Sequence, residues 1–453
     1  MKAANKKYVC SVCGSVHSKW VGQCPDCQSW NCLEEVTSLS QPKNIGFLGK
    51  TSEAQDLSEV STEKVVRVDT GIGEFNRVLG GGLVPGSVVL LGGDPGIGKT
   101  TILMQSIGMM SSDQRLKTIY VTGEESPSQI KIRADRLNLR DLNFKVLAET
   151  SVNLILLEIE RLKPDVIVID SIQTMVNEES QSSPGSVSQV KESAARFVKL
   201  AKQKNIAFFL IGHVTKEGAI AGPRILEHMV DVTLYFEGHS DGRYRIVRAI
   251  KNRFGTVNEI GVFFMTDGGL REVSNPSSIL LSRHEKPVSG SVVAASIEGT
   301  RPILVEVQSL LDKSSSGVPR RLTVGIEQNR VAMLLAVLSR HGDVSTSAYD
   351  VFANIVGGMR LTETGADLPI LLAILSSLRN RPFPSDTVCF GELGLAGEVR
   401  PVSGGVLRIK EAHKQGFEKA IVPKGNAPKN SPDNMEIFVV SRLSEVLALF
   451  VDG

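Results

Sequence analysis

Short, largely apolar runs alternate with longer amphipathic stretches between residues 65 and 274. The runs are four or five residues long, which is typical of parallel strands buried on both faces; they lie at 87–91, 118–121, 166–169 and 207–211. The stretches between them carry apolar residues at helical spacing, at 100–110, 153–162 and 187–203. This alternation predicts a doubly wound α/β domain with a parallel sheet.

The pattern changes on both sides of this domain. Residues 36–63 are rich in Ser, Thr, Gln and Lys and lack sustained periodicity, so we interpret them as a linker. Beyond residue 275, β-rich pieces precede helical patterns; they lie at 290–297, 303–307 and 322–325, and at 330–340, 367–378 and 407–416. We therefore expect a cysteine-containing segment over 1–35, the linker, the α/β domain over 64–275, and an α+β domain over 276–453.

Composition narrows the class of protein. The chain has 453 residues, and at ~150 residues per domain this predicts about three units. Hydrophobic residues make up 42% and charged residues 22%, which excludes wholesale disorder. Lys and Arg number 51 against 49 for Asp and Glu, so a nucleic-acid surface would be a local patch.

The lengths of the apolar runs also bear on the cellular location of the protein. No apolar run approaches the ~20 residues of a membrane span, and the polar start of the chain is not a signal peptide. We expect a cytoplasmic protein without a membrane partner. Its six cysteines should then be reduced thiols or metal ligands.

Four cysteines form two C-x-x-C pairs separated by ten residues: Cys10, Cys13, Cys24 and Cys27. Each pair supplies two thiolates from a tight turn, and four thiolates in a tetrahedron bind structural Zn²⁺. A segment this short cannot bury enough apolar surface, so the metal would stabilise its fold. Two disulfides are the alternative, which a cytoplasmic location disfavours. His17 and Cys32 are spare candidates that we do not assign as ligands.

Both tryptophans of the chain, Trp20 and Trp30, fall in this cysteine-containing segment. If they are exposed, they could stack on nucleic-acid bases. If they are buried, they would form the minimal core around the metal. The sequence leaves both interpretations open.

Residues 93–100 read GDPGIGKT and match the G-x-x-x-x-G-K-[ST] motif between an apolar strand and a predicted helix. Backbone N–H groups of such a loop surround phosphates, and the helix N-terminus adds a partial positive charge. Lys99 would reach the β- and γ-phosphates, and the Thr100 hydroxyl would bind Mg²⁺. The predicted nucleotide-binding residues are Gly93, Asp94, Pro95, Gly96, Ile97, Gly98, Lys99, Thr100 and Thr101.

Two further strands end in carboxylates. The run 166–170 ends at Asp170, as a Walker B element requires, and this carboxylate would act in the magnesium shell. The strand before Gly123 is followed by Glu124 and Glu125, and a carboxylate there can orient and deprotonate the attacking water. An ordinary solvated turn is the alternative for this pair. We favour catalysis, with Glu124 ahead of Glu125.

The spacing of the phosphate loop, the strand-end glutamates and Asp170 resembles the RecA-type ATPase core. The sequence KNRFG at 251–255, together with the four-cysteine segment, resembles the RadA (Sms) family of bacterial DNA repair proteins over essentially the whole chain. The resemblance implies ATP as the nucleotide and a homo-hexameric ring. It also implies that Lys251 and Arg253 reach the γ-phosphate of the neighbouring subunit. The alternative for these two residues is an exposed turn closed by Gly255.

Two DNA-binding loops follow from the same resemblance. The first corresponds to residues 175–186, and the second follows the strand 207–211, with Lys216 and Arg224 as its cations. His213 stands where such proteins carry a polar γ-phosphate sensor. From the residues alone, His213 fits a structural role equally well, and Lys216 and Arg224 fit solvated surface charges.

The last third resembles the proteolytic domain of Lon proteases, at residues 365–369 and 390–401. Lon requires a serine nucleophile in the first stretch and a lysine base on the helix after the second. Here Asp367 and Val406 fall near those positions, so a serine–lysine dyad cannot be assembled. We expect the fold without the proteolytic chemistry.

The resemblance implies a DNA-dependent ATPase of homologous recombination and DNA repair. Such a helicase-like motor would process or migrate branched intermediates on single-stranded DNA, with a recombinase or the replicative machinery as partner. Two alternatives come from other classes: an ATP-dependent protease, which the missing dyad disfavours, and a nucleotide-switched scaffold like the circadian-clock ATPases. DNA stimulation of ATP hydrolysis would separate the motor from the scaffold.

Overall fold

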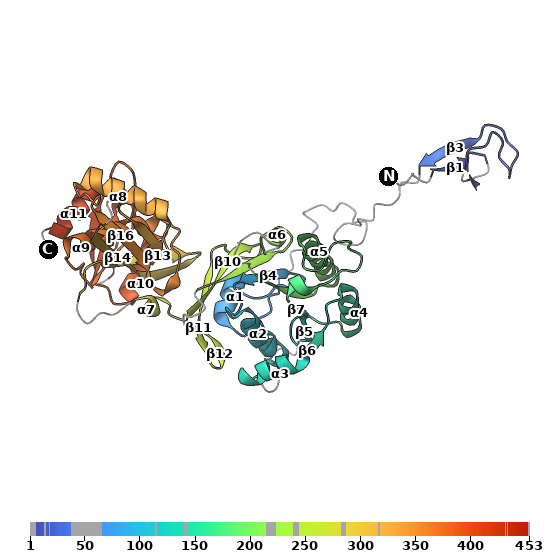
Figure 1. Cartoon of the computed structure of the whole chain (residues 1–453), viewed down its shortest axis with the longest axis horizontal. Helices are drawn as coiled ribbons and strands as arrows, with labels where there is room; N and C mark the ends of the chain where they lie inside the picture. The colour runs from blue at the N-terminus through green and yellow to red at the C-terminus, as the bar shows by residue number, and fades with distance from the viewer. Residues whose placement is uncertain are drawn as a thin grey trace. The chain divides into compact units, whose positions relative to one another are not determined.

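The computed structural model describes 6–12, 15–17, 19–37, 66–113, 116–139, 143–213, 223–238, 244–281, 287–315, 318–430, 432 and 434–451. The chain divides into two compact units, 1–61 and 62–453 (Figure 1). Within these described residues, every helix is too short or too polar to cross a membrane.

The first unit is a small antiparallel sheet with the strand order β2-β1-β3. Its strands are β1 (Lys6–Cys10), β2 (Val16–His17) and β3 (Leu33–Thr37). The buried side chains that pack together are three cysteines and one leucine, namely Cys10, Cys24, Cys32 and Leu33. Trp20 and Trp30 are 53% and 71% exposed, so they do not form this core. Sulfur atoms therefore occupy the centre of the unit.

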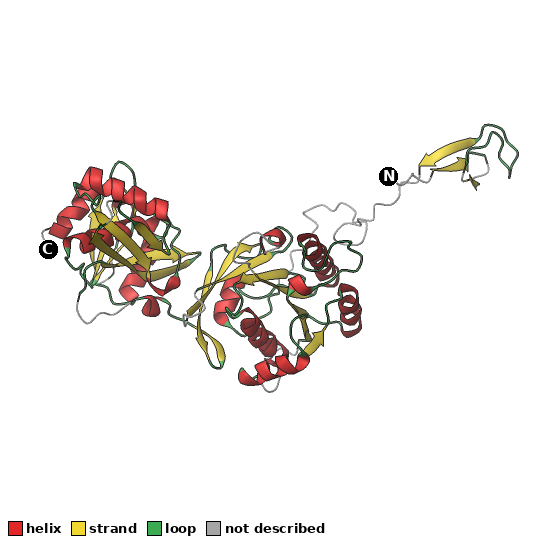
Figure 2. Cartoon of the chain, viewed as in Figure 1, coloured by secondary structure: helices red, strands yellow, loops and turns green. Residues whose placement is uncertain are grey.

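The second unit contains a nine-stranded sheet with the order β12-β11-β10-β9-β4-β8-β7-β5-β6 (Figure 2). The parallel part consists of β4 (Val88–Gly93), β8 (Ala207–His213), β7 (Val166–Asp170), β5 (Thr118–Thr122) and β6 (Lys145–Ala148). All side chains of β4, β5 and β7 are buried. The predicted doubly wound α/β core is confirmed.

Helices cover both faces of this sheet. One apolar cluster includes residues of α1 (Gly73–Leu79), α2 (Lys99–Asp113) and α3 (Pro127–Arg136). A second cluster includes residues of α4 (Val152–Leu162) and α5 (Val187–Lys204). Ser126, Ser151 and Ser186 cap α3, α4 and α5 by accepting a hydrogen bond from a first-turn backbone N–H.

The predicted alternation of strands and helices ends earlier than expected. The next four strands are β9 (Val232–Glu237), β10 (Tyr244–Asn252), β11 (Ile260–Thr266) and β12 (Gly269–Glu272). β9 still pairs in parallel with β4, and β10, β11 and β12 form an antiparallel extension of the sheet beyond it. The connections between them, 238–243, 253–259 and 267–268, are too short for the crossover that a parallel neighbour requires. The prediction of alternation up to residue 274 was wrong over β10, β11 and β12, and it holds through β9.

The C-terminal part has a seven-stranded sheet with the order β15-β16-β14-β13-β17-β20-β21. These strands are β13 (Ser291–Glu298), β14 (Arg301–Lys313), β15 (Arg321–Val324), β16 (Tyr349–Ile355), β17 (Thr387–Cys389), β20 (Lys419–Pro423) and β21 (Glu436–Val440). Its helices are α8 (Gln328–Gly342), α9 (Asp367–Arg379), α10 (Gly405–Lys414) and α11 (Leu443–Val451). A short hairpin, β18 (Glu392–Leu393) and β19 (Val399–Arg400), lies beside it.

Packing is continuous between the two large sheets of the second unit. Ile246, Ile260 and Val262 of the first sheet share one buried cluster with side chains of the second. Polar contacts join the same region, where Arg301 forms an ion pair with Glu74 at 2.7 Å. The predicted boundary at 275/276 falls between the two sheets, just before the short helix α7 (Ser277–Leu280).

Candidate nucleotide-binding site

The phosphate loop connects β4 to α2, and glycines give it the required backbone conformation. Gly93, Gly96 and Gly98 have φ angles of 145°, 76° and 122°, which side-chain-bearing residues rarely adopt. A Cβ atom at Gly93 would lie 2.9 Å from the Cβ of Phe236. At Gly96, by contrast, a Cβ would meet nothing within 4 Å. The loop is thus packed against the protein on one side and open on the other.

Lys99 lies at the first position of α2 with its side chain 3% exposed. Its Nζ donates hydrogen bonds to the carbonyl oxygens of Gly93 (2.7 Å) and Asp94 (2.8 Å). Burial lowers the pKa of Lys99 to about 8. The ammonium group is therefore held by neutral acceptors that phosphate oxygens can replace.

Three oxygen-bearing side chains meet beside Lys99. The Thr100 hydroxyl donates to Oδ2 of Asp170 at 2.9 Å, and the Tyr120 hydroxyl donates to the same oxygen. Burial raises the pKa of Asp170. A hydroxyl and a carboxylate are oxygen donors of the kind that Mg²⁺ prefers, so Thr100 and Asp170 fit this ion. Sequence reasoning missed Tyr120, although a tyrosine in an apolar strand needs a partner for its hydroxyl.

Glu124 follows β5 and lies between the ends of β7 and β8. Its Oε1 accepts hydrogen bonds from Ser171 Oγ (2.6 Å) and His213 Nε2 (3.2 Å). The bond from His213 is the main reason that the pKa of Glu124 falls to about 2. Polar atoms of Glu124, Asp170 and His213 all lie within 4.8 Å of one another. The structure therefore brings together three side chains that the sequence places up to 89 positions apart.

Two buried polar atoms next to Glu124 are without a partner among the described residues. They are Nδ1 of His213 and Oε1 of Gln173. Gln173 is fixed by its amide group, which donates to the carbonyl oxygen of His213 at 3.2 Å. Buried polar groups are usually hydrogen-bonded, so these orphaned atoms are what a site for a polar ligand would contain.

Glu125 lies next to Glu124 in sequence but has different neighbours. It forms an ion pair with Arg133 of α3, and its backbone N–H donates to Thr122 Oγ1 at 2.9 Å. The ion pair ties Glu125 to the last turn of α3. The arrangement agrees with placing Glu124 ahead of Glu125, and the catalytic role itself stays a prediction.

Lys251 and Arg253 lie at the opposite edge of the sheet from their own phosphate loop. The backbone N–H of Arg253 donates to the Asp231 carbonyl (3.2 Å), and Val88, the first residue of β4, donates to the Asp231 side chain (3.0 Å). The phosphate loop follows the last residue of β4, which is six residues long, and this length places the two edges ~17–20 Å apart. Lys251 and Arg253 therefore lie too far from their own phosphate loop to contact a phosphate bound there.

The two basic side chains are held in place differently at this edge. Lys251 Nζ donates to the carbonyl oxygens of Glu227 (2.6 Å) and Val230 (2.9 Å), and burial lowers its pKa. The Arg253 side chain is 57% exposed and lies 3.2 Å from Asp231. In the isolated chain, Arg253 therefore fits the alternative of an exposed turn, whereas Lys251 does not.

The predicted DNA-binding residues are only partly described. Lys216 lies outside the described residues, and so does the side chain of Arg224, although α6 (Pro223–Leu226) is described. The first predicted DNA loop, 175–186, is anchored at its start, since Met175 and Asn177 are buried. Its remainder leads to Ser186, the cap of α5.

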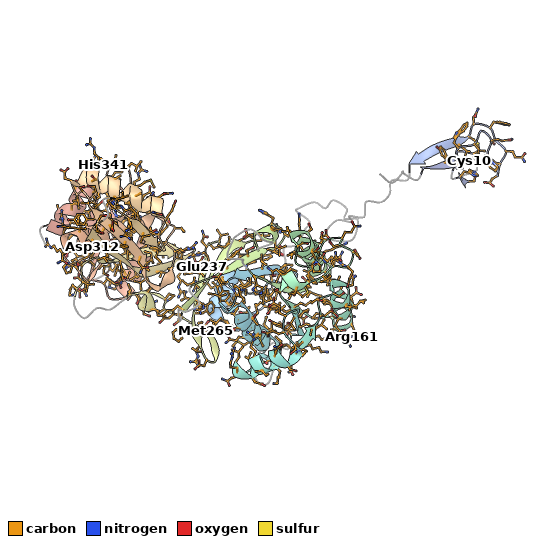
Figure 3. All side chains as sticks on the ribbon, in the orientation of Figure 1. Cys10, Arg161, Glu237, Met265, Asp312 and His341 are labelled. Atoms are coloured by element: carbon orange, nitrogen blue, oxygen red, sulfur yellow. The ribbon has the colours of Figure 1, made fainter. Side chains whose placement is uncertain are left out.

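Sulfur atoms converge in the first unit (Cys10 is labelled in Figure 3). The thiols of Cys27 and Cys32 lie 3.5 and 3.4 Å from that of Cys10. The Cys24 thiol lies 3.7 Å from Nε2 of His17, and a hydrogen bond with Ser15 is the main reason that its pKa falls to about 5. Clustered thiols suit Zn²⁺. Cys13 lies outside the described residues.

The two residues set aside as spare candidates, His17 and Cys32, both lie in this sulfur-rich region. Cys32 was kept as a spare candidate and was not assigned as a ligand, and it belongs to neither C-x-x-C pair. The available signal was its position five residues after Cys27 in a segment of minimal core.

The Lon-like part has a cleft of about 600 Å³ at the predicted position of the protease nucleophile. Asp367, the first residue of α9, accepts from Nε of Arg330 (2.7 Å) and from the Leu393 N–H (3.0 Å). The described residues lining this cleft include neither a serine nor a lysine. Val406, near the predicted position of the lysine base, is exposed on α10.

Family models match three segments of the chain. A rubredoxin metal-binding domain matches residues 8–35, an AAA domain matches 54–219, and subunit ChlI of Mg-chelatase matches 327–426. The first match supports Zn²⁺ as the metal of the small unit, and the second supports the assignment of a nucleotide and Mg²⁺.

Full-length relatives carry a single name. The "DNA repair protein RadA" of Pseudomonas aeruginosa is 56% identical over 99% of this chain and 100% of its own length. The protein of that name from Escherichia coli is 51% identical over 100% of this chain and 99% of its own. Among solved structures, a KaiC-like protein of Pyrococcus horikoshii aligns over 46% of this chain and 99% of its own, with 19% identity and a TM-score of 0.39.

Proposed function

Because this chain belongs to the RadA family of DNA repair proteins, we propose that it is a DNA-dependent ATPase of homologous recombination. In this proposal it is a helicase-like motor that processes or migrates branched intermediates on single-stranded DNA. The observation that carries the ATPase part is the convergence of Lys99, Asp170 and Glu124 beside a phosphate loop that is open on one side.

The chemistry follows from the charges of these side chains. The loop N–H groups and Lys99 would bind the β- and γ-phosphates of ATP, which replace the carbonyl oxygens that Lys99 now contacts. Thr100 and Asp170 would hold Mg²⁺, which neutralises charge on the phosphates when bound. Phosphoryl transfer needs little covalent help, so the protein contributes mainly position and charge.

Glu124 would act on the attacking water. Its carboxylate is ionised at neutral pH, and the hydrogen bonds from Ser171 and His213 lower its pKa further. An ionised carboxylate can accept the proton of a water molecule as the oxygen attacks the γ-phosphorus atom. His213 would sense the γ-phosphate, since it pairs with Gly93 in the neighbouring strand β4.

We propose that the catalytic site is completed by a neighbouring subunit in a homo-hexameric ring. Lys251 and Arg253 lie at the sheet edge opposite to their own loop, and Arg253 presents an exposed guanidinium. A cation supplied in trans contributes ~10³–10⁵ in rate in related phosphoryl-transfer systems.

Mixed rings test this arrangement. An Arg253→Ala chain supplies an intact loop, and a Lys99→Ala chain supplies intact cations, so mixed rings should regain hydrolysis that neither pure variant has. A chain carrying both substitutions, mixed with Lys99→Ala, is the control and should stay inactive. No recovery at any ratio, with mixed rings shown to form, would contradict a shared site.

DNA would bind through the segments after β7 and β8, with Lys216 and Arg224 contacting phosphates. The protein would act in the cytoplasm, where a recombinase or the replicative machinery supplies the branched intermediates. The decisive experiment is ATP hydrolysis and strand extension, each measured with and without single-stranded DNA. Hydrolysis that DNA does not stimulate would favour a nucleotide-switched scaffold instead.

Salt dependence tests the two DNA-binding cations. If Lys216 and Arg224 contact phosphates, each alanine variant should reduce the slope of log K against log salt by roughly 0.7 on a single strand. An unchanged slope would identify these side chains as solvated surface charges.

A further inference from the structure

A buried arginine outside the nucleotide-binding motif contacts the phosphate loop from behind. Arg245 belongs to β10, and its Nε donates a hydrogen bond to the carbonyl oxygen of Ile97 at 3.0 Å. Its Nη1 donates to the Tyr244 carbonyl at 2.9 Å, and the residue is 3% exposed. The two bonded residues, Arg245 and Ile97, are 148 positions apart in the sequence.

This hydrogen bond controls the direction of a neighbouring N–H group. The Ile97 carbonyl and the Gly98 N–H belong to one planar trans peptide unit, so they point in opposite directions. A carbonyl oxygen held towards Arg245 therefore turns the Gly98 N–H away from β10. Gly98 has a φ of 122° and no side chain, so its own conformational preferences restrain this peptide little.

The side-chain atoms nearest to Gly98 are apolar. A Cβ atom at Gly98 would lie 3.1 Å from Cε of Met265, the side chain labelled in Figure 3, and 3.2 Å from Cδ1 of Leu270. Apolar packing is non-directional and does not select one orientation of a peptide. The guanidinium of Arg245 supplies directional, charge-assisted hydrogen bonding at this place.

We propose that Arg245 is a positioning residue of the phosphate loop, which holds the Ile97–Gly98 peptide so that the Gly98 N–H is presented to the β-phosphate. This inference rests on the proposed nucleotide-binding function of the loop. It assigns a role in binding the phosphates to a strand of the antiparallel extension, which lies outside the phosphate-loop motif.

The same strand provides a matched control. Arg248 is also buried on β10 (7% exposed), but its partners are Glu237 (2.7 Å) and Glu298 rather than the loop. If loss of any buried arginine weakened nucleotide binding through general loosening of the sheet, both residues would behave alike. If Arg245 acts on the Gly98 N–H, only its substitution should weaken binding.

The experiment measures binding of a fluorescent ADP analogue to the full-length protein. Arg245→Met should raise the Kd about 10- to 100-fold, because a buried hydrogen bond from a charged donor is lost. Arg245→Lys keeps a charged donor and should restore part of this affinity. Arg248→Met should lower the unfolding temperature yet leave the Kd within about two-fold of the wild-type value.

Steady-state kinetics provide a second readout. The bond acts on the ground state and the transition state alike, so Arg245→Met should raise the KM for ATP and leave kcat nearly unchanged. A folded Arg245→Met variant with wild-type ADP affinity would overturn the inference. If wild-type protein hydrolyses ATP and Lys99→Ala does not, the proposed function survives that outcome.

If Arg245→Met does not fold, Arg245→Gln is the second variant for the same binding measurement. Its amide is a donor but is too short to reach the Ile97 carbonyl from β10, so the same loss of ADP affinity is expected. Wild-type affinity in Arg245→Gln would equally overturn the inference.

Discussion

The phosphate-loop site and the cleft beside α9 both contain buried charged side chains, but the partners of these charges differ. At the phosphate loop, Lys99 contacts only neutral carbonyl oxygens, and polar atoms of His213 and Gln173 are buried without a partner among the described residues. In the cleft, Asp367 is paired with Arg330 through both carboxylate oxygens.

A second ion pair lies at the same cleft. Arg408 of α10 has a fully buried side chain, and its two terminal nitrogens donate to the two carboxylate oxygens of Glu363 at 2.7 and 2.6 Å. Charges paired in this way are costly to separate, because each would be left without compensation. A ligand that entered the cleft would have to break such pairs, whereas phosphates at the loop only replace neutral acceptors. The phosphate-loop site is therefore prepared to bind an anion, whereas the charges in the cleft beside α9 neutralise one another.

The largest effect is expected from Lys99→Ala. It removes the buried cation at the phosphate loop, and hydrolysis should fall by more than ~10³-fold, because this cation stabilises charge that develops on the phosphates. The measurement is phosphate release at saturating ATP. Lys117→Ala, an exposed lysine outside the site, is the control and should hydrolyse ATP normally. Wild-type turnover by Lys99→Ala would refute the assignment of the loop.

Glu124→Gln should slow hydrolysis by ~10²–10⁴-fold while nucleotide still binds, because the amide cannot accept the proton of the attacking water. The matched variant is Glu125→Gln, which breaks the ion pair with Arg133 and leaves the Glu124 carboxylate in place. It should change the rate only a few-fold. Single-turnover hydrolysis and equilibrium binding measure both effects. If Glu125→Gln is the slower variant, the two roles are reversed.

Asp367→Asn tests the internally neutralised cleft. It should lower the free energy of unfolding by roughly 2–4 kcal/mol, since Arg330 loses its counter-ion while keeping some contact with water. Asp312→Asn is the control on an exposed strand position (Asp312 is labelled in Figure 3) and should change stability by less than about 0.5 kcal/mol. Denaturant unfolding measures both.

A third variant at this cleft tests the chemistry. Asp367→Ser restores the nucleophile position of Lon proteases, but no lysine lies among the described residues that line the cleft. The variant should digest no casein. Proteolysis by Asp367→Ser would show that another group can serve as the base.

Four strands of the parallel core, β4, β5, β7 and β8, are predicted because they are short, largely apolar and buried. Val166–Asp170 shows both features of such a strand, an apolar run and a carboxylate at its end. The fifth strand, β6, begins with a lysine and is not buried, and it was not predicted. The antiparallel pairing of β10, β11 and β12 was not predicted, because the length of a connection decides between hairpin and crossover and an apolar run does not. Local pattern thus identifies elements more readily than it identifies their neighbours.

The residues of the candidate site differ in the same way: local motifs predict some of them, and the others depend on contacts between distant parts of the chain. Lys99, Thr100 and Asp170 belong to contiguous motifs, so spacing alone identifies them. Tyr120 contacts Asp170, 50 positions away, and Arg245 contacts Ile97, 148 positions away. A local sequence motif cannot predict contacts between residues so far apart in the sequence. Cys32 was set aside for a similar reason, since its proximity to Cys10 depends on the pairing of β1 with β3.

The smallest expected effect concerns pH, and it tests whether His213 keeps Glu124 ionised. In the folded protein the pKa of Glu124 falls from its usual 4.5 to about 2, with the bond from His213 as the largest cause. Stability from this lowered pKa is present above pH 4.5 and is lost as the pH falls towards 2.

In His213→Ala the pKa of Glu124 should return to its usual range or slightly above, because the carboxylate remains partly buried. With a pKa of at least the usual 4.5, about a quarter or more of Glu124 would be protonated at pH 5, so the rate relative to wild type should fall at least about 1.3-fold between pH 8 and pH 5. The comparison with wild type at each pH removes the titration of ATP itself. A ratio that stays constant across this range would show that His213 does not control the charge of Glu124.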